Sequence, residues 1–245
     1  RQPRKIVHRT PGVVGGTRQY GRVAPIDPMA RFSDLTREWF ASAFSTPTPA
    51  QAQAWQAIAD GHNTLVIAPT GSGKTLAAFL WAIDRLAQEP ANTNGAKGTK
   101  VLYVSPLKAL AVDVERNLST PLTGITRVAE RVGTPAPDIT VGVRSGDTSP
   151  AQRRQLIATP PDILITTPES LFLMLTSAAR ETLATVRTVI VDEVHAVAAT
   201  KRGAHLALSL ERLDELLDKP AQRIGLSATV KPPEEVARFR LPQVL

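Results

Sequence analysis

The sequence predicts an α/β protein with one open, mainly parallel β-sheet that is flanked by helices on both faces. Short runs of β-branched and aliphatic residues alternate along the chain with longer stretches of helical periodicity, which is typical of βαβ units. A glycine-rich turn joins the first of these runs to a helical stretch, and two adjacent carboxylates follow a later run. The 245 residues and 42% hydrophobic content suffice for one large core.

Each apolar run is expected to form a strand, namely Thr64–Ala68, Val101–Ser105, Ile139–Val143, Ile163–Thr167, Thr188–Asp192 and Arg223–Ser227. Helices are expected over Phe32–Phe44, Thr75–Ala87, Leu107–Leu118, Ser170–Ser177 and His205–Leu217. In the last helix, leucines at helical spacing form an apolar stripe that we assign to the core: Leu206, Leu210, Leu213 and Leu217. Because an open parallel sheet binds ligands at the carboxyl ends of its strands, the residues just after each strand are the first functional candidates.

Charge and composition exclude several classes of site. The absence of cysteine excludes disulfides and thiolate chemistry. Four scattered histidines disfavour a structural zinc site. The net charge of +7 is concentrated at the start, since residues 1–22 hold six of the 29 basic residues and no acid. We therefore expect a disordered basic tail over 1–28 and one domain over 29–245. The longest strongly apolar stretch, Leu76–Ile83, is too short to span a membrane, and we expect a cytoplasmic protein.

The strongest local signal is the turn between the first strand and its helix. It nearly fits the phosphate-loop pattern, with Ala68 where the strict pattern has glycine. Its glycines let successive backbone N–H groups face an anion at the positive end of the helix dipole. The lysine would reach the β- and γ-phosphates, and the following threonine would ligate Mg²⁺. The sequence thus predicts a nucleotide-binding loop formed by Pro69, Thr70, Gly71, Ser72, Gly73, Lys74 and Thr75.

The fifth expected strand ends in two adjacent carboxylates, Asp192 and Glu193. Carboxylates at a strand end commonly just face solvent, but beside a phosphate loop they predict catalysis. Asp192 suits a magnesium-binding role, and Glu193 is placed to orient or deprotonate an attacking water.

The phosphate loop and the box Asp192-Glu193-Val194-His195 resemble the superfamily 2 helicases of the DEAD/DEAH-box type. Leu226-Ser227-Ala228-Thr229 resembles the third motif of that group. The resemblance implies a RecA-like P-loop NTPase domain that binds ATP and Mg²⁺. It also implies that His195, Ser227 and Thr229 join the catalytic set, with both hydroxyls hydrogen-bonding to the acidic box and coupling hydrolysis to strand separation.

Upstream, Pro47-Thr48-Pro49-Ala50-Gln51 resembles the adenine-reading motif of the same group. The amide of Gln51 offers one donor and one acceptor, which matches N6 and N7 of adenine and favours ATP over GTP. Trp39, Phe40 or Phe44 could stack on the base, but packing within their own helix explains these aromatics equally well.

Three segments resemble motifs that grip a nucleic-acid strand: one begins Ser105-Pro106, one is Ser145-Gly146-Asp147-Thr148, and one begins Thr166-Thr167-Pro168. Backbone N–H groups and hydroxyls at such strand ends can receive phosphates without reading bases. Ordinary capped helix starts are the alternative. The predicted strand contacts are Pro106, Lys108, Gly146, Thr167 and Pro168.

Beyond these motifs, residues 31–245 resemble the large helicase-related (Lhr) family, notably over Phe44–Leu86 and His195–Leu213. That resemblance implies an ATP-dependent translocase acting on single-stranded DNA and RNA:DNA hybrids, linked to DNA repair and associated with the nucleoid. Nothing after Thr229 resembles the arginine-containing sixth motif of a second RecA-like domain. We therefore expect a piece of a longer motor that binds ATP and strand but does not unwind alone.

Two other function classes fit the phosphate loop. One is a P-loop NTPase of another kind, such as a small-molecule kinase, which leaves Gln51 and Ser227-Ala228-Thr229 unexplained. The other is a non-enzymatic nucleic-acid-binding module with a vestigial pocket, against which the intact Lys74 and Glu193 argue.

Overall fold

The computed structural model describes residues 27–89 and 98–229. Within them, a parallel sheet of six strands has the order β1-β6-β5-β2-β4-β3. The strands are β1 (Thr64–Ile67), β2 (Val101–Val104), β3 (Val141–Arg144), β4 (Ile163–Thr166), β5 (Thr188–Val191) and β6 (Gln222–Ser227). The predicted open, parallel α/β sheet is confirmed.

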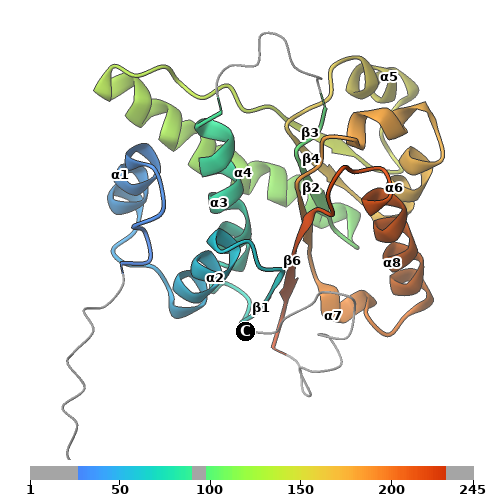
Figure 1. The fold of residues 1–245 in the computed structure, drawn as a ribbon, viewed down its shortest axis with the longest axis horizontal. Helices are drawn as coiled ribbons and strands as arrows, with labels where there is room; N and C mark the ends of the chain where they lie inside the picture. Colours follow the sequence, from blue (N-terminus) through green and yellow to red (C-terminus); the bar gives the residue numbers. More distant parts are fainter. Residues whose placement is uncertain (1–26, 90–97, 230–245) are drawn as a thin grey trace, which may run out of the picture.

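Helices cover both faces of this sheet (Figure 1). One face carries α1 (Asp34–Ala43), α2 (Pro49–Ala59), α3 (Lys74–Ala87) and α4 (Lys108–Val132). The other carries α5 (Pro150–Ala158), α6 (Pro168–Leu175), the 3₁₀ helix η1 (Ala178–Leu183) and α8 (Lys201–Asp214), and the one-turn helix α7 (Val194–Val197) follows β5. All but η1 and α7 are α-helices of eight or more residues.

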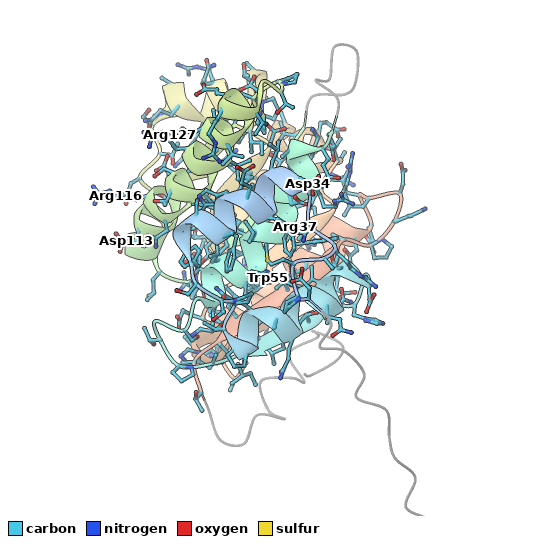
Figure 2. The ribbon with its side chains drawn as sticks, turned by 90° about the vertical axis from the view of Figure 1, so that its left-hand side faces the viewer. Asp34, Arg37, Trp55, Asp113, Arg116 and Arg127 are labelled. Atoms are coloured by element: carbon cyan, nitrogen blue, oxygen red, sulfur yellow. The ribbon has the colours of Figure 1, made fainter. Side chains whose placement is uncertain are left out.

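Aromatic side chains dominate the core under α1–α4. Trp55 is 1% exposed, and its indole N–H donates to the Ala77 carbonyl oxygen at 3.0 Å, which ties α2 to α3. Phe32 meets the Trp55 ring edge-on at 5.1 Å between centroids. Figure 2 views this side, with Trp55 enclosed and Arg116 and Arg127 along the outer edge of α4. Burial of these rings fixes α2 and α3, and with them the loop between β1 and α3.

A second, aliphatic core fills the opposite face. The predicted leucine stripe of α8 lies there, with Leu206, Leu210 and Leu213 buried and Leu217 packed against them. Strand residues alternate between the two cores, as period-two side-chain geometry requires. The core assignment of the stripe is confirmed.

The register of the sheet brings the ends of the strands to one edge. Ile67 pairs with Ser227, and Val191 pairs with both Val104 and Gly225. Therefore the phosphate loop, the segment after β5 and the end of β6 lie next to each other. Across the sheet, β4 and β3 bring the other candidate loops to the same edge.

Most predicted boundaries hold within a few residues, and two elements differ more. Helix α4 continues to Val132, past its internal Pro121, where a stop was expected near Leu118. Strand β3 begins at Val141 rather than Ile139 and ends on Arg144. No helix of the described residues is long and apolar enough to cross a membrane. Except for its last two residues, the predicted 1–28 tail lies outside the described residues.

Candidate active site

The loop between β1 and α3 has the backbone shape that an anion cradle needs. Gly71 and Gly73 both have φ of +81°, a left-handed conformation that is strained for other residues. The Lys74 ammonium turns back over the loop and donates to the carbonyl oxygens of Ala68 at 2.6 Å and Pro69 at 2.9 Å. Lys74 is thereby held at the centre of the loop.

Gln51 and Thr48 hold this loop from α2. The Gln51 amide is 4% exposed; its oxygen accepts the Thr48 N–H at 2.9 Å, and its nitrogen donates to the Gly73 carbonyl oxygen at 3.4 Å. The Thr48 hydroxyl donates to the Ser72 carbonyl oxygen at 3.3 Å. Gln51 is therefore a helix-capping residue that also supports the loop. Its reading of adenine stays a prediction.

Asp192 is buried at the end of β5 beside the loop. It is 8% exposed; one carboxylate oxygen accepts the Glu193 N–H at 2.8 Å, and the other accepts the Tyr103 phenol proton. Burial and the negative charge of Asp192 raise the pKa of Tyr103, so the phenol stays a donor. Tyr103 was not predicted to join the site, because a tyrosine within an apolar strand is indistinguishable from an ordinary core residue in the sequence.

Glu193 takes a left-handed conformation, with φ of 47°, and is the only non-glycine among the described residues with positive φ. Its carboxylate lies 3.2 Å from Nε2 of His195, the second residue of α7. On the other side of the ring, Nδ1 of His195 accepts the Ala228 N–H at 3.3 Å. His195 thus lies between the end of β6 and Glu193 and contacts both.

The third motif contacts the acidic box differently from the expectation. The Ser227 hydroxyl lies 3.3 Å from Nδ1 of His195 and donates to the Ala228 carbonyl oxygen at 2.9 Å, and its catalytic role stays a prediction. The second contact comes from the backbone N–H of Ala228, whereas Thr229 is exposed beyond the end of β6. The chain leaves the sheet at Ser227, which turns the Ala228 amide rather than the Thr229 side chain towards His195. A catalytic role of Thr229 stays a prediction.

The phosphate loop and the two acidic residues line one cavity of about 420 Å³. Its lining includes predicted residues from both motifs and residues of α4 that were not predicted: Thr70, Gly71, Gly73, Lys74, Thr75, Asp192, Glu193, Asp113 and Asn117. The Ser72 hydroxyl is buried without a hydrogen-bond partner in the described residues. An unsatisfied hydroxyl, N–H groups around left-handed glycines and a central ammonium fit a polyphosphate.

A magnesium ion also fits the donor set. Within 27–89 and 98–229, no three His, Cys, Asp or Glu side chains form a metal site by themselves. Mg²⁺ is typically held by one or two protein oxygens together with substrate phosphates. Thr75 and Asp192, which line the same cavity, are the residues that would hold it.

The three segments predicted to grip a strand lie at the same edge of the sheet, and Arg202 of α8 joins two of them. Its guanidinium donates to both carboxylate oxygens of Glu169 and to the carbonyl oxygen of Pro106. The ion pair lowers the pKa of Glu169 and raises that of Arg202. Arg202 was not predicted, since a charged residue at a helix start is usually solvated.

The residues predicted to contact a nucleic-acid strand differ in how far they are exposed to solvent. Pro168 and Thr167 are buried, and the Thr167 hydroxyl accepts the Ser170 N–H at 3.3 Å, so it caps α6 as the alternative interpretation held. Gly146 is exposed in the turn after β3. Lys108 begins α4, and its side chain lies outside the described part. Strand contacts by these residues stay predictions.

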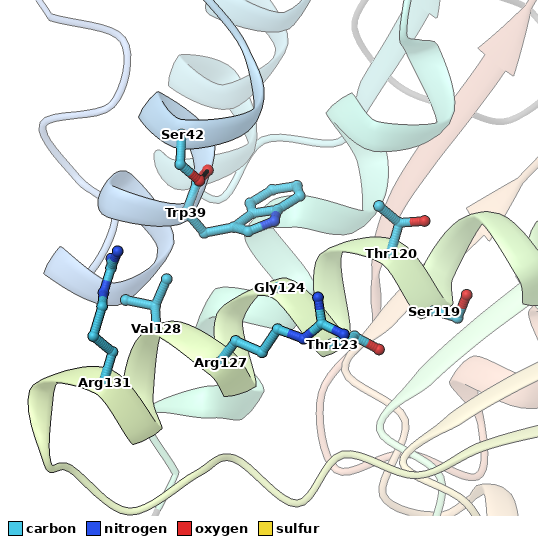
Figure 3. A pocket seen from close by; sticks show the side chains of 9 residues that line it. All are labelled: Trp39, Ser42, Ser119, Thr120, Thr123, Gly124, Arg127, Val128 and Arg131. Carbon is cyan, nitrogen blue, oxygen red and sulfur yellow. Dashed lines mark hydrogen bonds between the residues drawn. The ribbon is translucent and has the colours of Figure 1, made fainter.

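The aromatic residues proposed for base stacking are mainly structural. Trp39 and Phe40 are 5% and 4% exposed and lie in the core, so neither ring can stack on a base. The suggestion that these two residues stack on the base is wrong. Phe44 is 43% exposed and stacks on Phe40. A cavity of about 600 Å³ lies beside Trp39, between α1 and α4 (Figure 3). It shares no lining residue with the cavity at the phosphate loop.

Comparison with known proteins agrees with this geometry. The DEAD/DEAH box helicase family matches residues 48–238. The Lhr helicase/probable uracil glycosylase of Mycolicibacterium smegmatis is 83% identical over 87% of this chain, and the Lhr helicase/uracil glycosylase of Escherichia coli is 58% identical over 85%. The ATP-dependent helicase Lhr-Core of Methanocaldococcus jannaschii is 47% identical over 83% of this chain and 24% of its own length.

A solved structure of the Mycobacterium smegmatis helicase Lhr bound to ssDNA and AMP-PNP superposes with a TM-score of 0.84 at 79% identity, covering 89% of this chain and 28% of that one. The DEAD-box helicase Mss116, at 19% identity and a TM-score of 0.71, shares the fold. The chain spans 14% of the length of the two bacterial Lhr relatives. It therefore belongs to the DEAD/DEAH box helicase family, as a RecA-like domain that resembles those of Lhr helicases.

Proposed function

We propose that this chain is the first RecA-like domain of an ATP-dependent helicase that moves along nucleic acid. The observation that carries the proposal is the connection between its motifs. Lys74 and Glu193 line one cavity, and the end of β6 reaches Glu193 through His195. A kinase or a vestigial pocket has no need for such a path from a strand end to the acidic box.

The chain's own groups suit phosphoryl transfer to water. Lys74 would offset the charge of a bound triphosphate, and Thr75 and Asp192 would hold Mg²⁺. Bound ATP with Mg²⁺ supplies a γ-phosphoryl group that water can attack. Glu193 orients that water and accepts its proton, and His195, which lies 3.2 Å from the Glu193 carboxylate, keeps it in position.

The partner is proposed to be a nucleic-acid strand, either single-stranded DNA or one strand of an RNA:DNA hybrid. Loops after β2, β3 and β4 meet at one edge of the sheet, where contacts to the backbone of a strand would ignore base identity. The solved Lhr structure that this chain resembles is described as bound to ssDNA.

The remaining parts of the motor lie beyond this domain. We propose that residues 29–245 form the first RecA-like domain and that a second such domain supplies the arginine that stabilises the transition state. Such an arginine contributes on the order of 10³ to 10⁵ in rate. A role in DNA repair, at the nucleoid in the cytoplasm, is part of the same proposal and follows from the Lhr resemblance.

The test measures nucleotide binding and ATP hydrolysis with and without single-stranded DNA. A fluorescent ATP analogue should bind the parent chain and the control Lys201→Ala, whose residue is exposed on α8, but not Lys74→Ala. Hydrolysis by this chain should be slow, and adding the second domain should make it fast and DNA-dependent. Hydrolysis that DNA never stimulates would favour another class of P-loop NTPase, and absent nucleotide binding would favour a non-enzymatic module.

A further inference from the structure

The last residue of β3, Arg144, is a buried cation without a counter-charge. Alternation along the strand places Val141 and Val143 against the core under α1–α4, so Arg144 faces the opposite layer, where α5 lies. It is 7% exposed, and its Nη1 has no hydrogen-bond partner in the described residues. Burying an unpaired guanidinium is unfavourable, which makes its presence at a strand end informative.

A second arginine, Arg153 of α5, stands next to it. Arg153 donates from Nη2 to the carbonyl oxygen of Gly146 at 3.0 Å, while its Nε is buried without a partner. Burial lowers the pKa of Arg144, and the positive charge of Arg153 lowers it further, so the two guanidinium groups act on each other. None of the ion pairs among the described residues includes either arginine.

The position of the pair decides which anion it would meet. Arg144 pairs in register with Thr166, so the pair lies beside the start of α6 and beneath the turn that holds Gly146. The phosphate loop follows β1 at the far edge of the six-stranded sheet. At a strand spacing of about 4.8 Å, the two edges are about 24 Å apart, which is too far for one nucleotide to bridge.

We propose that Arg144 and Arg153 form a binding site for one backbone phosphate of the nucleic-acid strand. The inference rests on the proposed function and adds two residues to it that no motif in the sequence identified. Two like charges with unfilled donors beneath an exposed turn become favourable when a phosphodiester arrives, because its oxygens accept from both guanidinium groups. Such a contact ignores base identity, as a tracking motor requires.

The experiment measures binding of a fluorescent oligo(dT) strand to the 245-residue chain over a series of salt concentrations. Arg144→Gln should bind about tenfold more weakly at low salt, because it loses a charge-assisted contact. The slope of log affinity against log salt should fall by about 0.7, the value for one phosphate contact on a single strand. Arg144→Lys should keep the slope. The control is Arg154→Gln, the exposed neighbour on α5, which should match the parent.

Two further readouts separate this site from a structural role and from the proposed function. Binding of the fluorescent ATP analogue should be unchanged in Arg144→Gln, and the thermal midpoint should stay level or rise, since Nη1 has no partner to lose and the buried charge is removed. A parent-like salt slope in Arg144→Gln and Arg153→Gln would overturn the inference while leaving the helicase proposal intact. If Arg144→Gln fails to bind nucleotide, the salt dependence of strand binding by Arg153→Gln alone decides whether the phosphate site exists. A parent chain that binds nucleotide but no strand would overturn both.

Discussion

The phenol of Tyr103 donates its proton to the carboxylate of Asp192 from within the core of the sheet. This bond aims the carboxylate at the cavity that Lys74 and Thr75 line. Partners that orient a metal ligand often matter nearly as much as the ligand itself.

Tyr103→Phe should weaken Mg²⁺-dependent nucleotide binding. The substitution leaves one oxygen of a buried carboxylate without its donor, so Asp192 is held less firmly. We expect about tenfold weaker affinity for a fluorescent ATP analogue in Mg²⁺. Titration in the presence of a chelator is the control, because metal-free binding should match the parent. Equal losses with and without Mg²⁺ would mean that Tyr103 supports the fold rather than the metal site.

Glu193→Gln should separate nucleotide binding from turnover. The amide keeps the shape of the side chain but cannot accept a proton from water, so hydrolysis should fall by about 10² or more in a chain that includes the second domain. Phosphate release gives the rate, and analogue binding should stay at the parent level. A variant with parent-like turnover would remove Glu193 from its catalytic role.

Gly73→Ala should disturb the phosphate loop more than Gly71→Ala does. Both positions have φ of +81°, so each alanine carries backbone strain of about 1–3 kcal/mol. Only at Gly73 would the new Cβ also lie 2.5 Å from the Gln51 amide nitrogen, whereas nothing lies within 4 Å of it at Gly71. Chemical unfolding should show a larger loss of stability for Gly73→Ala. Gln51→Ala in the same chain should remove that difference, and no relief would disprove the clash.

The Glu169–Arg202 pair should give this domain an acid-sensitive contribution to stability. Arg202 lowers the pKa of Glu169 in the folded state. A carboxylate of this kind stabilises the fold fully at a pH above its pKa in the unfolded chain. That stabilisation is lost as the pH falls through the lowered pKa of the folded state. Between about pH 5 and about pH 3, the thermal midpoint should therefore fall more in the parent than in Glu169→Gln. Glu215→Gln, at an exposed position after α8, should follow the parent.

The sequence allowed the fold and the nucleotide loop to be predicted because both rest on local patterns. Apolar runs placed five of the strands within one residue at each end. The sequence suggested a helix that stops near Leu118, but α4 continues past Pro121 because the buried Leu118, Ile125 and Val128 keep its later turns on the core. Strand β3 was misplaced because Gly142 and Arg144 interrupt its apolar pattern.

The residues that the sequence left unidentified act through tertiary contacts. Tyr103 looks like core and Arg144 looks like a solvated strand end until the sheet brings them to Asp192 and to Arg153. Thr229 illustrates the reverse, since its motif predicts a side-chain contact that the backbone of Ala228 makes instead. Local pattern thus identifies which segments take part, and packing decides which atoms do.

Arg202 connects three segments that are distant in the chain, namely α8, the start of α6 and the turn before α4. The Arg202 guanidinium is bonded to the carbonyl oxygen of Pro106 before α4 and to the carboxylate of Glu169 on α6. A shift of any one of these three segments would therefore strain its bonds to the other two. Mechanically, the segments at this edge of the sheet are linked to one another and do not behave as separate loops. A force applied at Pro106 would therefore pass through Arg202 to α8 and α6, which pack in the aliphatic core.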